Sequence, residues 1–349
     1  MNCNLKQIPN LRQIARLQAD LRYSEAEALC RETLANSNSL PEQVSWQNRL
    51  ATILEAQGRY DEASSYAQAA LSSLEAAKKQ LSNSTAISLE LATLTNLGTY
   101  ERILGHYAQA ERTYLQGIHL AESQGLTHQQ LWLKLVNDLA IVYKYWGKFD
   151  PAEQLYQLVL SVLIEQHGEH HLEVATIYHN LAGLEHARRC YSTAEPQARK
   201  SYQLHVELLG KQHPKTIADG AALGSILHGL NQWDEAIALF EQAIAFFEQR
   251  LEHYEVAINL NNLAASLQAK GELQQAEPAY RRALEIKQKL FGEEHPDIGI
   301  SLNNLAVLLK QSGKTNQAKE LFAQALTIFE KTLGADHPHT RLCRENAAS

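Results

Sequence analysis

The sequence has little cysteine. Its four cysteines, Cys3, Cys30, Cys190 and Cys343, are scattered through 349 residues. They form none of the closely spaced pairs that hold zinc or that cross-link a small secreted domain. We therefore expect no bound metal and no disulfide framework, and a reducing cytoplasm is the simplest compartment for the chain.

Long apolar runs and an excess of positive charge are also absent. No stretch of the sequence approaches the ~20 apolar residues that cross a bilayer. Residues 1–16 alternate polar and apolar positions, unlike a signal peptide. The formal net charge is −7, so no broad surplus of lysine and arginine is available to neutralise phosphates. We expect neither membrane nor nucleic acid as a partner.

Signatures of catalysis are missing as well. The sequence contains no nucleophile motif, no phosphate-cradling glycine loop, no H-E-x-x-H pair and no paired acid and base. Its glycines stand singly, where a repeated unit would turn. We predict that the chain is not an enzyme and needs no cofactor.

Histidine is the residue type that could suggest a metal site. There are 15, and three of them fall within residues 167–171. However, His171 is in register with His295, at a linker position that recurs before a turn proline. The histidine–proline pairs begin at His213, His295 and His337. We expect these histidines to pack or to cap helices, since a metal would also need well-placed supporting partners.

What the sequence does contain is an internal repeat. Residues 262–286 and 304–328 share an N-L-A box followed by the same landmarks, offset by 42 residues. The matched landmarks are Gly271 with Gly313, Ala276 with Ala318, Tyr280 with Phe322, and Ala283 with Ala325. A period of roughly 20 to 50 residues indicates a solenoid or array.

One alanine of this unit marks a second helix along the whole chain. The marker alanines are Ala26, Ala63, Ala110, Ala152, Ala194, Ala236, Ala276 and Ala318. Asn231 replaces the turn glycine of the sixth unit, because asparagine tolerates the left-handed conformation. Residues 78–85 account for extra length in the second unit and are predicted to form an irregular loop. We expect eight helix pairs in one elongated domain, each pair burying surface against its neighbours.

The pattern of small and aromatic residues resembles the tetratricopeptide repeat, whose usual unit is about 34 residues. The longer unit, the N-L-A box, and linkers such as residues 291–297 and 333–339 resemble the repeats of kinesin light chains. The resemblance covers the chain from about residue 43 and concerns the repeat domain only, since no N-terminal heptad coiled coil is found. It implies an all-α, right-handed superhelical solenoid. The expected divisions are a capping repeat at 1–42, repeats at 43–336 and a truncated C-terminal helix at 337–349.

The resemblance also implies that first helices line a concave groove that receives a peptide or a partner's helix. Nine residues before each turn lie the positions that we call the ladder positions: Arg49, Asn96, Asp138, Asn180, Ala222, Asn262 and Asn304. An amide both donates and accepts, which suits a peptide backbone. We predict that Asn96, Asn180, Asn262 and Asn304 bind the ligand, supported by Asn48, Asn137, Asn261 and Asn303 one residue earlier. The alternative is that these amides only satisfy neighbouring repeats or caps. Ala222 interrupts the series and divides it into two half-grooves.

Positive charge is expected six residues after the ladder positions. Arg102, Lys144 and Lys310 lie there, nearly two helical turns along the same helices. They could bind an acidic side chain or a C-terminal carboxylate. The alternative is that they are ordinary solvated charges.

The sequence therefore predicts a non-catalytic scaffold or adaptor that binds a peptide segment or a partner protein in its groove. A peptide-sensing regulator and an oligomeric spacer, in which the chain associates with itself, are the alternatives. An enzyme or an accessory subunit of one is a third class, which activity in the purified protein would reveal.

Overall fold

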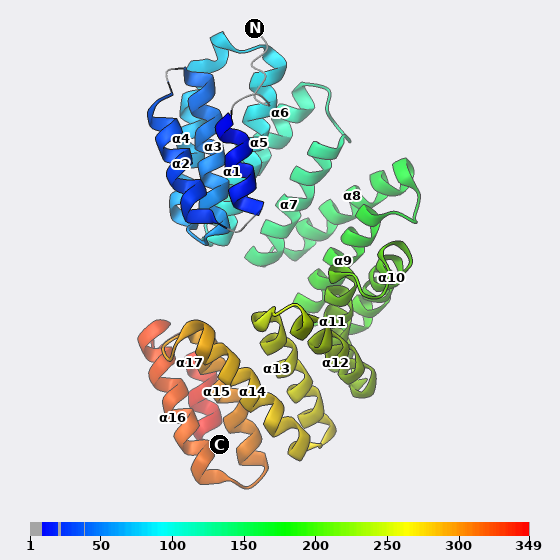
Figure 1. The fold of residues 1–349 in the computed structure, drawn as a ribbon. Helices are drawn as coiled ribbons and strands as arrows, with labels where there is room; N and C mark the ends of the chain where they lie inside the picture. Colours follow the sequence, from blue (N-terminus) through cyan, green and yellow to red (C-terminus); the bar gives the residue numbers. More distant parts are fainter. Residues whose placement is uncertain (1–8, 20–21, 38, 349) are drawn as a thin grey trace. The chain divides into compact units, whose positions relative to one another are not determined.

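The computed structural model describes residues 9–19, 22–37 and 39–348, which form seventeen α-helices (Figure 1). Contacts within the chain group it into two compact units, residues 1–166 and 167–349. The sequence did not predict this boundary. The helices of the first unit are α1 (Pro9–Ala19), α2 (Tyr23–Ala35), α3 (Leu40–Ala56), α4 (Tyr60–Ala77), α5 (Asn83–Ile103), α6 (Tyr107–Ser123), α7 (Gln130–Trp146) and α8 (Phe149–His167).

The second unit continues the alternation of helices. Its helices are α9 (Leu172–Ala187), α10 (Tyr191–Leu209), α11 (Pro214–Gly229), α12 (Trp233–Gln249), α13 (His253–Lys270), α14 (Leu273–Phe291), α15 (Pro296–Gln311), α16 (Thr315–Thr332) and α17 (Pro338–Ala348). Helices that follow one another in sequence pack together, from α1 to α7 in the first unit and from α9 to α17 in the second. First helices of neighbouring repeats, such as α5 and α7 or α9 and α11, also touch. The prediction of eight helix pairs followed by one further helix is confirmed.

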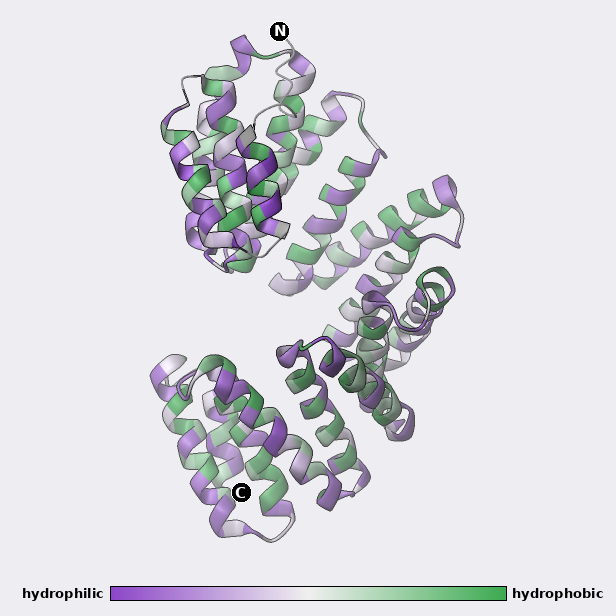
Figure 2. Cartoon of the chain, viewed as in Figure 1, coloured by the Kyte–Doolittle hydropathy of each residue, from purple (hydrophilic) through white to green (hydrophobic). Residues whose placement is uncertain are grey.

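The helices are amphipathic, with hydrophobic and hydrophilic residues interspersed along each one (Figure 2). The marker alanines are buried, and so are the aromatic residues four positions later, including Tyr114, Tyr156, Phe240, Tyr280 and Phe322. Small residues make room for these rings. A Cβ added to Gly98 would lie 2.7 Å from the ring of Tyr114. The aromatic ring thus fills the gap between the two helices of a repeat.

The turns within the repeats depend on the left-handed conformation. Gly271 has a φ of 91° and Asn231 a φ of 61°. In both turns the next backbone N–H donates to a carbonyl five residues earlier, at 2.9 Å. Asn231 therefore keeps the turn that glycine makes elsewhere, as predicted, because it reaches a positive φ more readily than most residues.

The predicted loop at residues 78–85 is mostly wrong. Lys78–Gln80 form a short 3-10 helix, and α5 begins at Asn83. The side chain of Ser82 caps α5 by accepting a hydrogen bond from the N–H of Thr85 at 3.3 Å. This cap lets the polar segment start a helix. The extra length of the second unit goes largely into α5, which has 21 residues.

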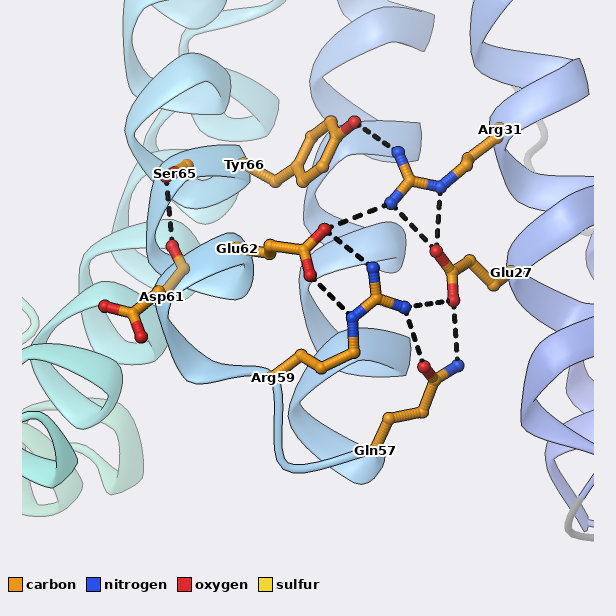
Figure 3. Close-up of polar contacts among 8 residues, drawn as sticks. All are labelled: Glu27, Arg31, Gln57, Arg59, Asp61, Glu62, Ser65 and Tyr66. Carbon is orange, nitrogen blue, oxygen red and sulfur yellow. Dashed lines mark hydrogen bonds and ion pairs between the residues drawn. The ribbon is translucent and has the colours of Figure 1, made fainter. Parts of the chain in front are cut away.

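Ion pairs join the second helices of neighbouring repeats in the first unit (Figure 3). Arg59, directly after a turn glycine, lies 2.6 Å from Glu27 on α2 and 2.6 Å from Glu62 on α4. Arg31 also contacts both carboxylates. The same tie recurs between Lys148 and Glu111 at 3.1 Å and between Lys314 and Glu277 at 2.7 Å. Partly exposed pairs of this kind contribute about 0–1 kcal/mol each.

Candidate functional site

The predicted asparagines all lie on first helices. Asn96 lies on α5, Asn180 on α9, Asn262 on α13 and Asn304 on α15, and all four are half-buried. Of the supporting residues, Asn48, Asn137 and Asn261 are half-buried and Asn303 is buried. We call the side of the first helices that carries the ladder positions the first-helix face.

Several of these amides pair across neighbouring repeats. Asn304 donates from Nδ2 to Oδ1 of Asn261 at 3.2 Å. Asn346 on α17 makes the same contact with Asn303, at 3.1 Å. Part of the amide capacity is therefore used between repeats, as the alternative interpretation expected. Each such bond still uses only one of an amide's two N–H donors and one of its lone pairs.

In the first unit the supporting amides contact other polar residues. Asn48 donates to Oγ1 of Thr93 at 2.7 Å. Asn137 donates to Asp138 at 3.2 Å, and Lys134 forms an ion pair with the same carboxylate at 2.6 Å. Asp138, at a ladder position, is therefore already neutralised on its own helix.

Two of the three predicted cations come together in the first unit. Arg102 on α5 and Lys144 on α7 both lie over the exposed ring of Tyr145, at 5.6 Å and 5.1 Å from its centroid. Burial lowers the pKa of Lys144, and the positive charge of Arg102 lowers it further. Within the described part of the chain, neither cation forms an ion pair with a carboxylate.

Lys310, the third predicted cation, serves a different contact. Its ammonium donates to the backbone carbonyl of Asn346 at 3.0 Å and so helps to hold α17 against α15. Lys310 lies in the second unit, whereas Arg102 and Lys144 lie in the first. Its role in binding stays a prediction for the second unit.

The linker histidines cap helices. Nδ1 of His171, His213 and His295 accepts a hydrogen bond from the backbone N–H two residues later, at 3.3, 3.2 and 3.2 Å. His295 also stacks on Phe291, with ring centroids 4.4 Å apart. The prediction that these histidines pack or cap is confirmed.

A cavity of roughly 230 Å³ opens between α9, α10 and α11 in the second unit. Its walls are His179, Ala182, Gly183, His186, Ala198, Ser201, Asp219, Ala222, Ser225 and Ile226. Ala198 stands four residues after its marker alanine, where five of the other repeats carry an aromatic ring. Ala222 is the ladder position with a small apolar side chain, in place of the asparagine found at Asn180, Asn262 and Asn304. Two small residues therefore leave the space open.

A buried carboxylate forms part of the cavity wall. Asp219 is 5% exposed, and Nδ1 of His179 and Nδ1 of His205 each lie 2.8 Å from one of its two oxygens. Ser201 also contacts this carboxylate and lies 2.9 Å from the carbonyl of Ala175. Although burial raises the pKa of Asp219, the hydrogen bonds from both histidines and Ser201 lower it to about 2. The group is therefore ionised at neutral pH.

The sequence reasoning missed this cluster, although a signal was present. Asp219 is in register with Asn259 and Ser301, which are also buried. His205 is in register with the buried Phe247 and Phe329. An acid and an imidazole at core positions of one repeat junction could have been found by aligning all eight units rather than two.

The described residues contain neither a metal site nor a membrane-spanning helix. Within residues 9–19, 22–37 and 39–348, no three or more histidine, cysteine, aspartate or glutamate side chains are placed to hold a metal ion. The helices of the same residues are all too short or too polar to cross a membrane.

Comparison with known proteins identifies the repeat. Sequence profiles of the tetratricopeptide repeat match residues 14–80, 173–249 and 255–331, more than half of the chain. Human tetratricopeptide repeat protein 23 is 25% identical over 122 residues, which is 35% of this chain and 27% of that protein. The chain thus spans about a quarter of the length of this relative.

Solved structures give the same result. The crystal structure of a Podosopora anserina putative kinesin light chain with nearly identical TPR-like repeats is 26% identical, with a TM-score of 0.51 over 58% of this chain and 96% of that chain. A Rap protein complexed with Competence and Sporulation Factor is 16% identical, with a TM-score of 0.57 over 87% of this chain and 86% of that chain. The profiles, the helix pairs and the register of their landmarks agree, and the chain belongs to the tetratricopeptide-repeat proteins, with repeats of the kinesin-light-chain type.

Proposed function

We propose that this protein is a non-catalytic scaffold or adaptor whose first-helix face binds a peptide segment or a partner protein. Tetratricopeptide-repeat proteins generally mediate protein–protein interactions. The observation that carries the proposal is the meeting of Arg102 and Lys144 over Tyr145 on neighbouring first helices.

Two like charges held close together disfavour each other's charged form. An anion between Arg102 and Lys144 removes that repulsion and forms charge-assisted hydrogen bonds with both side chains. Tyr145, 57% exposed, adds an accessible aromatic surface beside them. We infer that this part of the first unit receives an acidic side chain or a C-terminal carboxylate of the partner.

In the second unit, we propose that the amides of Asn180, Asn262 and Asn304 form hydrogen bonds with the backbone of the bound segment. Asn96 is assigned the same role in the first unit. All four side chains are half-buried, and the bond from Asn304 to Asn261 uses one of the two N–H donors of Asn304. An amide pairs with any peptide bond, so these contacts would bind the segment irrespective of its side chains.

The cysteines suit a cytoplasmic site of action. Cys30, Cys190 and Cys343 are free thiols. Burial raises the pKa of Cys30 to about 12 and that of Cys343 to about 11, so both thiols stay protonated and unreactive. We therefore place the proposed binding function in a reducing cytoplasm.

Capture of partners from a native lysate by the immobilised chain tests the proposal. The variants are Asn262→Ala with Asn304→Ala for the amides, and Arg102→Ala with Lys144→Ala for the cations. Asn316→Ala with Lys319→Ala, two exposed positions on the second helix α16, is the matched control.

We expect the control to retain every partner. The cation variant should retain at most about a tenth, because one hydrogen bond to a charged group is worth roughly 1.5–3 kcal/mol. The proposed site would be disproved if both site variants kept the circular dichroism of the unsubstituted chain and captured as much of every partner as it does.

A peptide-sensing regulator is the second candidate. The observation that favours it is the shared fold with a Rap protein crystallised with Competence and Sporulation Factor. A sensor would change its dimensions on binding its ligand, whereas an adaptor with a preformed surface would not. Small-angle scattering of the chain with and without a captured partner peptide distinguishes the two, and light scattering of the free chain tests the oligomeric spacer.

A further inference from the structure

At five positions the junction between α9, α10 and α11 differs from every corresponding position later in the chain. Ala198 replaces an aromatic residue, and Ala222 replaces a ladder asparagine. Ser201, His205 and Asp219 place polar groups at buried positions, each at most 5% exposed. Departures from a repeat pattern that gather in one place commonly mark function rather than folding.

The cavity lies where five of the other repeats hold an aromatic side chain. In the seventh repeat Tyr280 stands at the position of Ala198, and its hydroxyl donates to Gln268 at 3.1 Å. Gln268 is in register with His186, which is a wall of the cavity. An aromatic side chain such as Tyr280 therefore occupies this space in another repeat, and Ala198 leaves it empty.

The polar atoms around the cavity are chiefly acceptors. An ionised carboxylate only accepts, so the Nδ1 atoms of His179 and His205 must donate to Asp219. Ser225 donates its own proton to the carbonyl of Ala221 at 3.2 Å and so offers only lone pairs.

Asp219 brings a negative charge to the cavity wall. The hydrogen-bond partners of Asp219 are two imidazoles and a hydroxyl, none with a fixed positive charge. A buried carboxylate without a cation is costly, and a donor-rich cation would offset that cost. The remaining walls are largely apolar, including Ala182, Ala198 and Ile226.

We propose that this cavity binds a primary alkylammonium group, with its methylenes against the alanines and its N–H donors on Asp219. Two sources have this chemistry: the lysine side chain of a bound segment, and a small free amine. The lysine source rests on the proposed function, since it treats the cavity as a pocket of the first-helix face.

Titration of the full chain with n-butylamine in amine-free buffer tests the site. The readouts are the NMR shifts of the histidine rings and the melting temperature. We expect saturable binding of n-butylamine and none of n-butanol, which has the same chain without the charge. No saturation, or equal effects of the two compounds, would overturn the proposal.

Two kinds of variant locate the binding. Ala198→Phe restores the aromatic residue of the other repeats and should abolish binding by filling the space. Asp219→Asn removes the charge and should weaken binding about tenfold or more, because a hydrogen bond to a charged group is lost. Ala222→Asn, which restores the ladder residue, tests the cavity again if Ala198→Phe does not fold.

Tyr280→Ala is the matched control, because it opens the corresponding space in a repeat that lacks the carboxylate. We expect no additional amine binding in this variant. Full binding of n-butylamine by folded Ala198→Phe or Ala222→Asn would overturn the assignment to this cavity.

Short peptides identify the source of the ammonium group. Acetyl-Ala-Lys-Ala-amide should compete with n-butylamine, and the same peptide with norleucine should not. If n-butylamine binds and the lysine peptide does not, the site takes a free small amine. The titration needs no protein partner, so its failure leaves the lysate capture standing, and failure of the capture leaves the amine site standing.

Discussion

Asp219→Asn should destabilise the second unit in a pH-dependent way. The substitution keeps the size of the side chain and removes its charge, so the hydrogen bonds from His179 and His205 lose their ionised acceptor. The pKa of Asp219 is about 2 instead of 3.8 in the reference state. At roughly 1.4 kcal/mol for each pKa unit, ionisation stabilises the folded state by about 2.5 kcal/mol.

The direction of the pH effect follows from the lowered pKa. The folded state holds Asp219 ionised more strongly than the unfolded state does. The stabilisation is therefore complete above the reference pKa of 3.8 and is lost as the pH falls towards 2. The stability of the unsubstituted chain should exceed that of the Asp219→Asn variant by about 2.5 kcal/mol at neutral pH. This difference in stability should decrease across that acid range.

The assay is hydrogen exchange of the α9–α11 backbone amides, followed by mass spectrometry at neutral pH and in acid. It measures the local stability of this junction and does not require two-state unfolding of the whole chain. Asp234→Asn is the control, since that carboxylate is 85% exposed and pairs with Lys270 at the surface. The Asp234→Asn control should lose about 1 kcal/mol of stability or less. Equal protection of the Asp219→Asn variant and the unsubstituted chain at neutral pH would refute the reasoning.

Substitutions at three further positions test the fold. His295→Ala should lower the free energy of unfolding by about 1 kcal/mol through loss of the cap of α15, and His295→Asn should restore most of it, as urea titrations can show. Asn231→Ala should cost about 1 kcal/mol at its φ of 61° while Asn231→Gly costs nothing, and equal stabilities would contradict the left-handed turn. Tyr280→Ala should cost about 3–5 kcal/mol by calorimetry, since a buried ring leaves a cavity.

The repeat fold could be predicted because its landmarks are local. Each unit carries a marker alanine, and most units carry a turn glycine and an aromatic residue at fixed offsets from it, so helix pairing follows from one unit and its neighbour. Where the prediction failed, a single side chain decided the outcome. Ser82 supplies a cap that turns part of an expected loop into the start of α5.

The candidate sites were less predictable because they depend on contacts between helices. Sequence spacing placed Arg102 and Lys144 at equivalent positions, but only the structure brings both to Tyr145. The cavity is still harder to predict from the sequence, because Ala198 and Asp219 come from different helices and meet only at this junction. An alignment of units shows that each residue is unusual, but it does not show that they share a wall.

The paired amides have a consequence for how a ligand would spread along the second unit. A peptide carbonyl that takes the N–H of Asn304 now directed at Asn261 leaves that oxygen in need of a new donor, which the next peptide N–H of the ligand can supply. A peptide backbone, which carries both groups, would thus replace the bond between the two amides without leaving a polar atom unpaired, whereas a ligand with an acceptor alone would not.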